Sequence, residues 1–102
     1  MAKQFELKVV QDEQGNPFDY RKVLIDILRI RQQGMDLAEM ETALGCIKAI
    51  RAANGTVVLE NEQHTYLMTR INENRWVIAD PCIVGFVHTV KDAPAYELTP
   101  QG

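Results

Sequence analysis

The spacing of apolar residues after Asp19 constrains the fold of this chain more than any other sequence feature. Apolar side chains recur there at intervals of three and four residues, the pattern of a helix with one face in a core. The positions are Tyr20, Val23, Leu24, Ile27 and Leu28, together with the aliphatic part of Arg31. Asp19 can accept backbone N–H groups of the first turn. We therefore expect a helix over residues 19–33.

A second helix is expected after Gly34. Asp36, followed three residues later by Glu39, is a capping pair, and Asn54-Gly55 can end the helix. The apolar positions at helical spacing are Leu37, Met40, Leu44, Ile47 and Ile50. A short connection favours antiparallel neighbours, so the two apolar stripes are predicted to face each other in a helical hairpin.

Two segments have the pattern of strands. The segment 5–9 alternates apolar and polar residues, which predicts that Phe5, Leu7 and Val9 face inward. Turn formers at 12–17 end this strand. The β-branched segment 56–59 is its natural partner, because a lone strand leaves backbone groups unpaired. We expect a two-stranded antiparallel sheet.

Residues 61–80 can be interpreted in two ways. As a helix, the segment is capped by Asn61 and carries Trp76 on a broad apolar side; as a hairpin, strands at 65–71 and 75–79 flank a turn. We favour the helix. Asp80-Pro81 indicates a further helix that runs to about Lys91.

The predicted fold is therefore an α+β domain in which a two-stranded sheet packs on three to four helices. Residues 1–94 are expected to form one domain, and residues 95–102 a flexible tail. The predicted core consists of Leu7, Val9, Leu24, Ile27, Leu28, Leu44, Ile47, Leu67, Trp76, Phe86 and Val87.

Composition narrows the class of protein. The chain has 102 residues, of which 46% are hydrophobic and 25% charged, as in an ordinary globular domain. The longest apolar runs fall far short of the roughly 20 residues of a membrane span. No secretory signal is expected, since the first residues lack an apolar segment. Cys46 and Cys82 lie in apolar surroundings without paired spacing, which indicates free thiols and predicts a cytoplasmic protein.

Several residues could carry chemistry. Cys82, near a helix start, is a candidate nucleophile with His64 or His88 as base, but Asp80 would oppose its thiolate. The two cysteines and two histidines lack the clustered spacing of a zinc site. The carboxylates of Asp36, Glu39, Glu41, Glu60 and Glu62 lie where helix starts are expected, where negative charge is stabilising. We therefore predict no catalytic residue, no cofactor and no metal, and thus no enzyme.

The helix at 19–33 carries an excess of positive charge from Arg21, Lys22, Arg29 and Arg31. One hypothesis is therefore a small nucleic-acid-binding regulator that contacts phosphates through these four side chains. However, their helical spacing points them in different directions, no aromatic residues are interleaved, and the net charge of the chain is −3. Nucleic acid is therefore the second choice of partner.

The preferred hypothesis is a protein interface. Ile25 and Ile30 lie off the apolar stripe of the first helix, and the last helix is apolar nearly all round, including Phe86 and Val90. A helix with one solvent-exposed face rarely carries large apolar residues on that face unless a partner covers them. Burial of these residues within the monomer is the alternative. We expect a non-enzymatic interaction module that binds a protein partner or assembles as a homo-oligomer.

The layout of the chain also resembles that of known small proteins. A strand, a turn with Gly15-Asn16-Pro17, a helix opening at Lys22-Val23-Leu24, and Leu59-Glu60 leading toward Asp80-Pro81 resemble small accessory proteins encoded among bacteriophage structural genes. The resemblance implies a virion-assembly or host-interaction factor that acts through its surfaces in the host cytoplasm or the virion.

Overall fold

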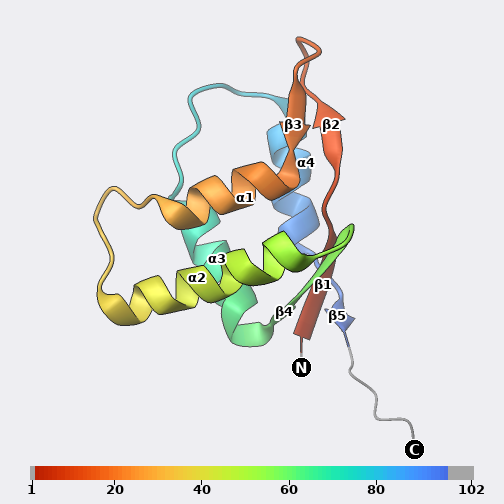
Figure 1. Ribbon diagram of the computed structural model, residues 1–102. Coiled ribbons are helices and arrows are strands. Elements are labelled where there is room, and N and C mark those ends of the chain that lie inside the picture. The colour runs from red at the N-terminus through yellow and green to blue at the C-terminus, as the bar shows by residue number, and fades with distance from the viewer. Residues whose placement is uncertain (1, 97–102) are drawn as a thin grey trace, which may run out of the picture.

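A computed structural model describes residues 2–96, and these residues form an α+β fold, as predicted (Figure 1). In chain order, the elements are β1 (Ala2–Glu6), β2 (Val9–Gln11), β3 (Pro17–Asp19), α1 (Tyr20–Arg29), α2 (Leu37–Ala52), β4 (Thr56–Glu60), α3 (Asn61–Glu73), α4 (Pro81–Lys91) and β5 (Ala95–Tyr96). The helices α1 and α2 lie side by side, and α3 packs against both of them and against the sheet.

The main sheet has three strands in the order β4-β1-β5, and all pairs are antiparallel. Phe5 of β1 lies opposite Val57 of β4, and both side chains are buried. The predicted pairing of the first strand with residues 56–59 is therefore confirmed. The sheet is wider than expected, because Ala95 and Tyr96 pair with β1 and are not part of a tail. The rest of the predicted tail, residues 97–102, lies outside the described residues.

The alternating segment 5–9 is not one strand. The chain leaves the main sheet after Glu6 and pairs as β2 with β3 in a separate hairpin. This break changes which side chains face inward, since a shift of one residue reverses the faces of a strand. Val10 packs against the core, whereas Val9 is 60% exposed, so the prediction of an inward Val9 is wrong.

The cap of α1 is as predicted, but the helix ends earlier than expected. The side chain of Asp19 accepts a hydrogen bond from the N–H of Arg21 at 3.0 Å. The helix ends at Arg29, and Ile30 is extended. Gly34 has a φ of +82°, a conformation that L side chains rarely adopt, in the connection to α2.

The helix α2 buries only part of the predicted face, because Ile47 and Ile50 are buried but the other predicted positions are not. Asp36 caps the helix by accepting from the N–H of Glu39 at 2.8 Å. The side chains that face the core are Ala43, Cys46, Ile47 and Ile50. Leu37, Met40 and Leu44 are exposed, because the neighbouring elements cover the face that carries the small residues Ala43 and Cys46.

The helical interpretation of residues 61–80 is confirmed for 61–73 and is wrong for 74–80, which include Trp76, and the hairpin alternative is wrong. Glu60 and Gln63 form a capping box at the start of α3, so Glu60 is the cap, not Asn61. The helix ends at Glu73, and residues 74–80 form an irregular connection. Trp76 lies in this connection and packs edge-on against Phe86, with 6.2 Å between ring centroids.

The helix α4 begins as predicted, with the Asp80 side chain accepting from the N–H of Cys82 at 2.9 Å and Pro81 in the first turn. Phe86 and Val90 both have 0% exposure. The prediction that these two residues form an interface is therefore wrong, because they face the core of the monomer. Phe86 completes an aromatic cluster with Phe18, Tyr20 and Trp76.

Most of the predicted core is found in the core. The buried members are Leu24, Ile27, Leu28, Ile47, Leu67 and Phe86. Three more, Leu7, Trp76 and Val87, are partly buried against them. The prediction is wrong at two positions, since Val9 is 60% exposed and Leu44 is 56% exposed.

Candidate interaction surface

The basic residues on α1 and just after it do not form a free phosphate-binding face. Arg21 donates from Nη1 to the carbonyl oxygen of Ile50 at 2.6 Å and from Nη2 to that of Ala53 at 2.8 Å. These carbonyls belong to the end of α2, where a positive charge is favourable. Arg21 therefore joins α1 to the end of α2, and its donors are used within the chain.

Arg31 is also engaged internally. Its guanidinium forms ion pairs with the carboxylates of Glu39 and Glu73, and the Nε of Arg31 donates to Oε1 of Glu73 at 3.1 Å. The hydrogen bond with Glu73 raises the pKa of Arg31. Lys22 and Arg29 are exposed. Two of the four predicted nucleic-acid contacts thus serve the fold, and the four side chains do not form one basic face.

Arg70 also bonds within the chain, and the sequence pattern did not single it out. It is 2% exposed, and its Nη2 donates to the carbonyl oxygens of Ile27 at 2.6 Å and Ile30 at 2.9 Å. Its Nη1 donates to the hydroxyl of Tyr66 at 2.6 Å, and that hydroxyl donates to Glu39 at 3.1 Å. Burial raises the pKa of Tyr66. This network holds the end of α1, the start of α2 and α3 together.

The cysteines are poor nucleophiles. Burial, and then the neighbouring Asp80 carboxylate, raise the pKa of Cys82 to about 11, so the thiol stays protonated near neutral pH. Burial alone raises the pKa of Cys46 to about 11. His64 is buried, and its Nε2 lies 2.7 Å from the carbonyl oxygen of Val90. In residues 2–96, no group of three or more potential ligands among His, Cys, Asp and Glu lies in a position to hold a metal ion.

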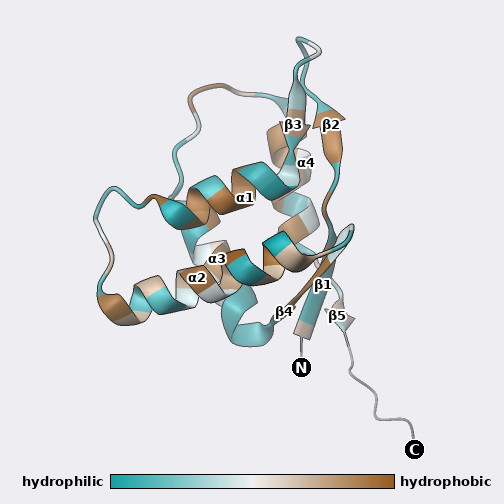
Figure 2. Ribbon diagram, in the orientation of Figure 1, coloured by the Kyte–Doolittle hydropathy of each residue, from teal (hydrophilic) through white to brown (hydrophobic). Residues whose placement is uncertain are grey.

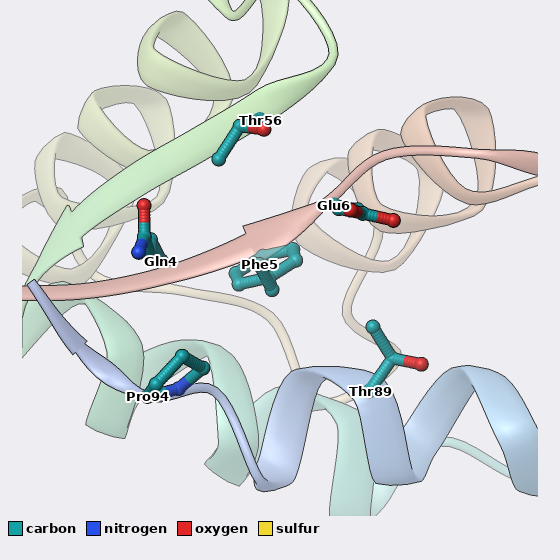
Figure 3. Close-up of a pocket in the computed structure, with 6 residues that line it drawn as sticks. All are labelled: Gln4, Phe5, Glu6, Thr56, Thr89 and Pro94. Carbon is teal, nitrogen blue, oxygen red and sulfur yellow. The ribbon is translucent and has the colours of Figure 1, made fainter.

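A pocket of about 400 Å³ opens between β1, α4 and the segment before β5 (Figure 3). Glu6 and Thr89, which is in the last turn of α4, line one end, and Gln4 and Pro94 line the other end. The full lining consists of Gln4, Phe5, Glu6, Thr56, Thr89 and Pro94. Glu6 is the one ionisable side chain among these six residues, so the lining offers no paired acid and base.

The most regularly spaced exposed apolar surface lies on α2. Leu37, Met40 and Leu44 are 72%, 42% and 56% exposed, and their spacing places them on one side of the helix. We call these three residues the α2 stripe. Figure 2 shows apolar segments along α2, beginning at its N-terminal end. Regular spacing on one long helix distinguishes the stripe from apolar residues that are exposed singly.

The other exposed apolar residues are more scattered, and two of them, Val9 and Val58, lie on strands. Ile30, a predicted interface residue, is 72% exposed and follows the last turn of α1. Ile25, also a predicted interface residue, is partly buried against the core. A second group consists of Val77 and Ile78, in the connection between α3 and α4, and Val84 on α4. None of these lies on a helix face with regular spacing.

Charged residues flank the α2 stripe. Glu41, Lys48 and Arg51 are exposed on the same helix, with the acid toward its start and the two basic residues toward its end. No ion pair within residues 2–96 includes any of the three. The exposed side of α2 is therefore apolar in its N-terminal half, where Glu41 lies among the stripe residues, and basic in its C-terminal half.

No helix in the described part of the chain is long and apolar enough to cross a membrane. No family model matches the chain, and neither a curated protein nor a solved structure matches it.

Proposed function

We propose that this chain is a protein-binding domain without chemistry of its own, and that the α2 stripe is its contact surface. The observation that carries the proposal is the exposure of Leu37, Met40 and Leu44 at helical spacing on a helix whose other face is packed in the core. An exposed apolar helix face with a charged border is the kind of surface that proteins use to bind other proteins.

Three arginines that bond within the chain support this proposal indirectly. The guanidinium groups of Arg21, Arg31 and Arg70 donate hydrogen bonds to carbonyl and carboxylate oxygens of the same chain. These contacts hold α2 in place against α1 and α3, so the stripe is presented on a fixed scaffold. A preordered surface loses less conformational entropy on binding than a flexible one.

The proposal also includes a cellular compartment and a biological role. The free thiols Cys46 and Cys82 fit a reducing cytoplasm. A virion-assembly or host-interaction role, implied by the resemblance to phage accessory proteins, fits a domain that acts through a surface.

The test compares capture of proteins by the full tagged chain and by two variants. The first variant replaces the stripe with glutamine (L37Q/M40Q/L44Q), a neutral residue with good helix propensity. The matched control replaces exposed apolar residues elsewhere (I78Q/V84Q). Surface substitutions change stability by only about 0.5 kcal/mol each, so both variants should be folded. Circular dichroism and urea unfolding check this.

We expect specific proteins, or untagged copies of the chain itself, to be retained by the wild type and the control. The stripe variant should retain them at least about tenfold less, which corresponds to the loss of roughly 1.4 kcal/mol of binding free energy. Equal retention by the stripe variant and the wild type would show that α2 is not the contact surface.

A further inference from the structure

Six of the exposed residues of α2 follow the spacing of a helix-pairing seam. Positions 37, 40 and 41, 44, 48 and 51 repeat at about 3.5 residues, the interval that keeps one side of a helix against a straight partner. All six residues are exposed. Leu44 lies at the centre of this seam, which spans about four turns of helix from Leu37 to Arg51. The seam therefore suits another helix of similar length.

The charges on this seam indicate which helix that is. Glu41 lies three residues before Leu44 and Lys48 lies four residues after it. If α2 meets a second α2 that runs in the opposite direction, with Leu44 against Leu44, each Glu41 lies beside the Lys48 of the other copy. The same arrangement places Leu37 against the aliphatic stem of Arg51 in the other copy.

We propose that α2 is a homodimerisation helix, which packs antiparallel on α2 of a second copy about a two-fold axis at Leu44. This inference rests on the proposed function and names its partner. The interface is isologous: the same surface is used by both copies, and each contact occurs twice. The two ion pairs across the axis fix the direction and the register.

Other arrangements of two α2 helices are disfavoured by charge. A parallel pair would bring Glu41 against Glu41 and Lys48 against Lys48, and it would align the two helix dipoles unfavourably. An antiparallel pair shifted to place Leu37 of one copy on Leu44 of the other would bring the two Glu41 side chains together. Like charges in these positions repel, so the register centred on Leu44 is selected.

The size of the interface sets the expected strength of the dimer. The 16 residues of α2 span about 24 Å, so one helix pair is a small interface by the standards of stable dimers. We therefore expect a reversible dimer with a micromolar dissociation constant. Ion pairs at an exposed rim are screened by salt, so dimerisation should weaken as ionic strength rises.

Charge reversal tests the pairing with the full chain, measured by sedimentation equilibrium over a range of concentrations. E41K alone places two lysine side chains together at each pair position, and K48E alone places two acids together. Each single variant should dissociate about tenfold more readily than the wild type, because two attractive pairs become repulsive. The double variant E41K/K48E should dimerise like the wild type.

Mixing the two single variants is the sharpest form of this test. A heterodimer of E41K with K48E has opposite charges at both pair positions, so the mixture should dimerise although neither variant does so alone at the same concentration. A partner protein other than a second copy would not produce this rescue. All the substitutions are at exposed positions, and circular dichroism checks that α2 remains helical.

Disulfide trapping tests the register. In a Cys82→Ala background, Leu44→Cys should give a covalent dimer on mild oxidation, because the two residues meet at the axis and their Cα atoms come within the roughly 7 Å that a disulfide spans. The matched control is Thr42→Cys, which is exposed but lies about 200° around the helix from Leu44. The control should cross-link at least about tenfold more slowly.

The outcomes separate this inference from the proposed function. A wild type that stays monomeric at millimolar concentration, or that dimerises without any response to E41K and K48E, would overturn the two-fold pairing of α2. If the α2 stripe is nevertheless needed for capture of another protein, the proposed function stands and its partner is that protein. If neither dimerisation nor capture depends on the stripe, both proposals fail.

Discussion

Replacement of Arg70 by methionine should destabilise the fold more than any other single change at a polar residue. Methionine keeps much of the apolar volume of the side chain but donates no hydrogen bond. The carbonyl oxygens of Ile27 and Leu28 would then lose their buried donor, and that of Ile30 a partly buried one. Tyr66 would lose its contact with the guanidinium.

The magnitude follows from these contacts. A buried acceptor left without a donor costs about 1–3 kcal/mol, and Arg70→Met leaves two buried carbonyls and one partly buried carbonyl in this state. We therefore expect Arg70→Met to lower the free energy of unfolding by about 4 kcal/mol. That is a large part of the roughly 5–15 kcal/mol available to a domain of this size. Arg70→Lys should cost about half as much, since an ammonium keeps the charge but not the planar fork.

Urea unfolding followed by circular dichroism measures this effect, provided that the slope of the transition is unchanged. Arg29→Met is the matched control, because Arg29 is also near the end of α1 but is exposed. Its loss should cost less than about 1 kcal/mol, the value of a positive charge near a helix end. If Arg70→Met costs no more than Arg29→Met, the guanidinium is not what holds the end of α1.

Three further predictions concern the aromatic cluster and the start of α4. Phe86→Ala should lower the free energy of unfolding by about 3–5 kcal/mol, because Phe86 is fully buried against three aromatic rings. Trp76→Ala should lower it by about 2 kcal/mol, because Trp76 is only partly buried. Equal losses in urea unfolding would contradict this difference in burial. Backbone N–H groups of Glu13 and Cys82 donate to Asp80 and lower its pKa, so this carboxylate stabilises the fold above the ordinary pKa of aspartate, and the contribution is lost as the pH falls through the lowered value. Asp80→Asn should therefore be less stable than the wild type at neutral pH, with a smaller difference in strong acid, and a difference that is independent of pH would refute the assignment. Because the pKa of Cys82 is about 11, iodoacetamide at neutral pH should modify its thiol at least about tenfold more slowly than free cysteine. A rate at or above that of free cysteine would show a thiolate that the structure does not account for.

The local signals in the sequence were sufficient for most helix starts. Asp19, Asp36 and Asp80 each accept from a backbone N–H of the first turn, as capping residues at predicted helix starts should. The antiparallel pairing of β1 with β4 was likewise predicted, because short apolar strands must satisfy their backbone groups. These features depend on residues close together in the chain, or on the one available partner.

The candidate site was only partly predictable. Ile30 was expected at a surface and is 72% exposed. Phe86 and Val90 were assigned to an interface and are in the core. The α2 stripe was expected to be buried and is the most regularly spaced exposed apolar surface. For α2 and α4 the helical periodicity was correct, but a helix with apolar residues on more than one side does not specify which side its neighbours cover.

The sequence by itself determined where the helices begin, that the class is α+β, and that more apolar residues are present than one helix face can hide. Only the tertiary structure decided which face of α2 is buried and which arginines are engaged within the chain. The physical reason is that packing selects among apolar faces by how closely neighbouring backbones can approach, and here Ala43 and Cys46 are small enough for that approach while Leu37 and Leu44 are left outside. The burial of Arg70 could not be predicted from the sequence, because the carbonyl oxygens that it bonds are 40 or more residues away in the chain and no local pattern indicates them.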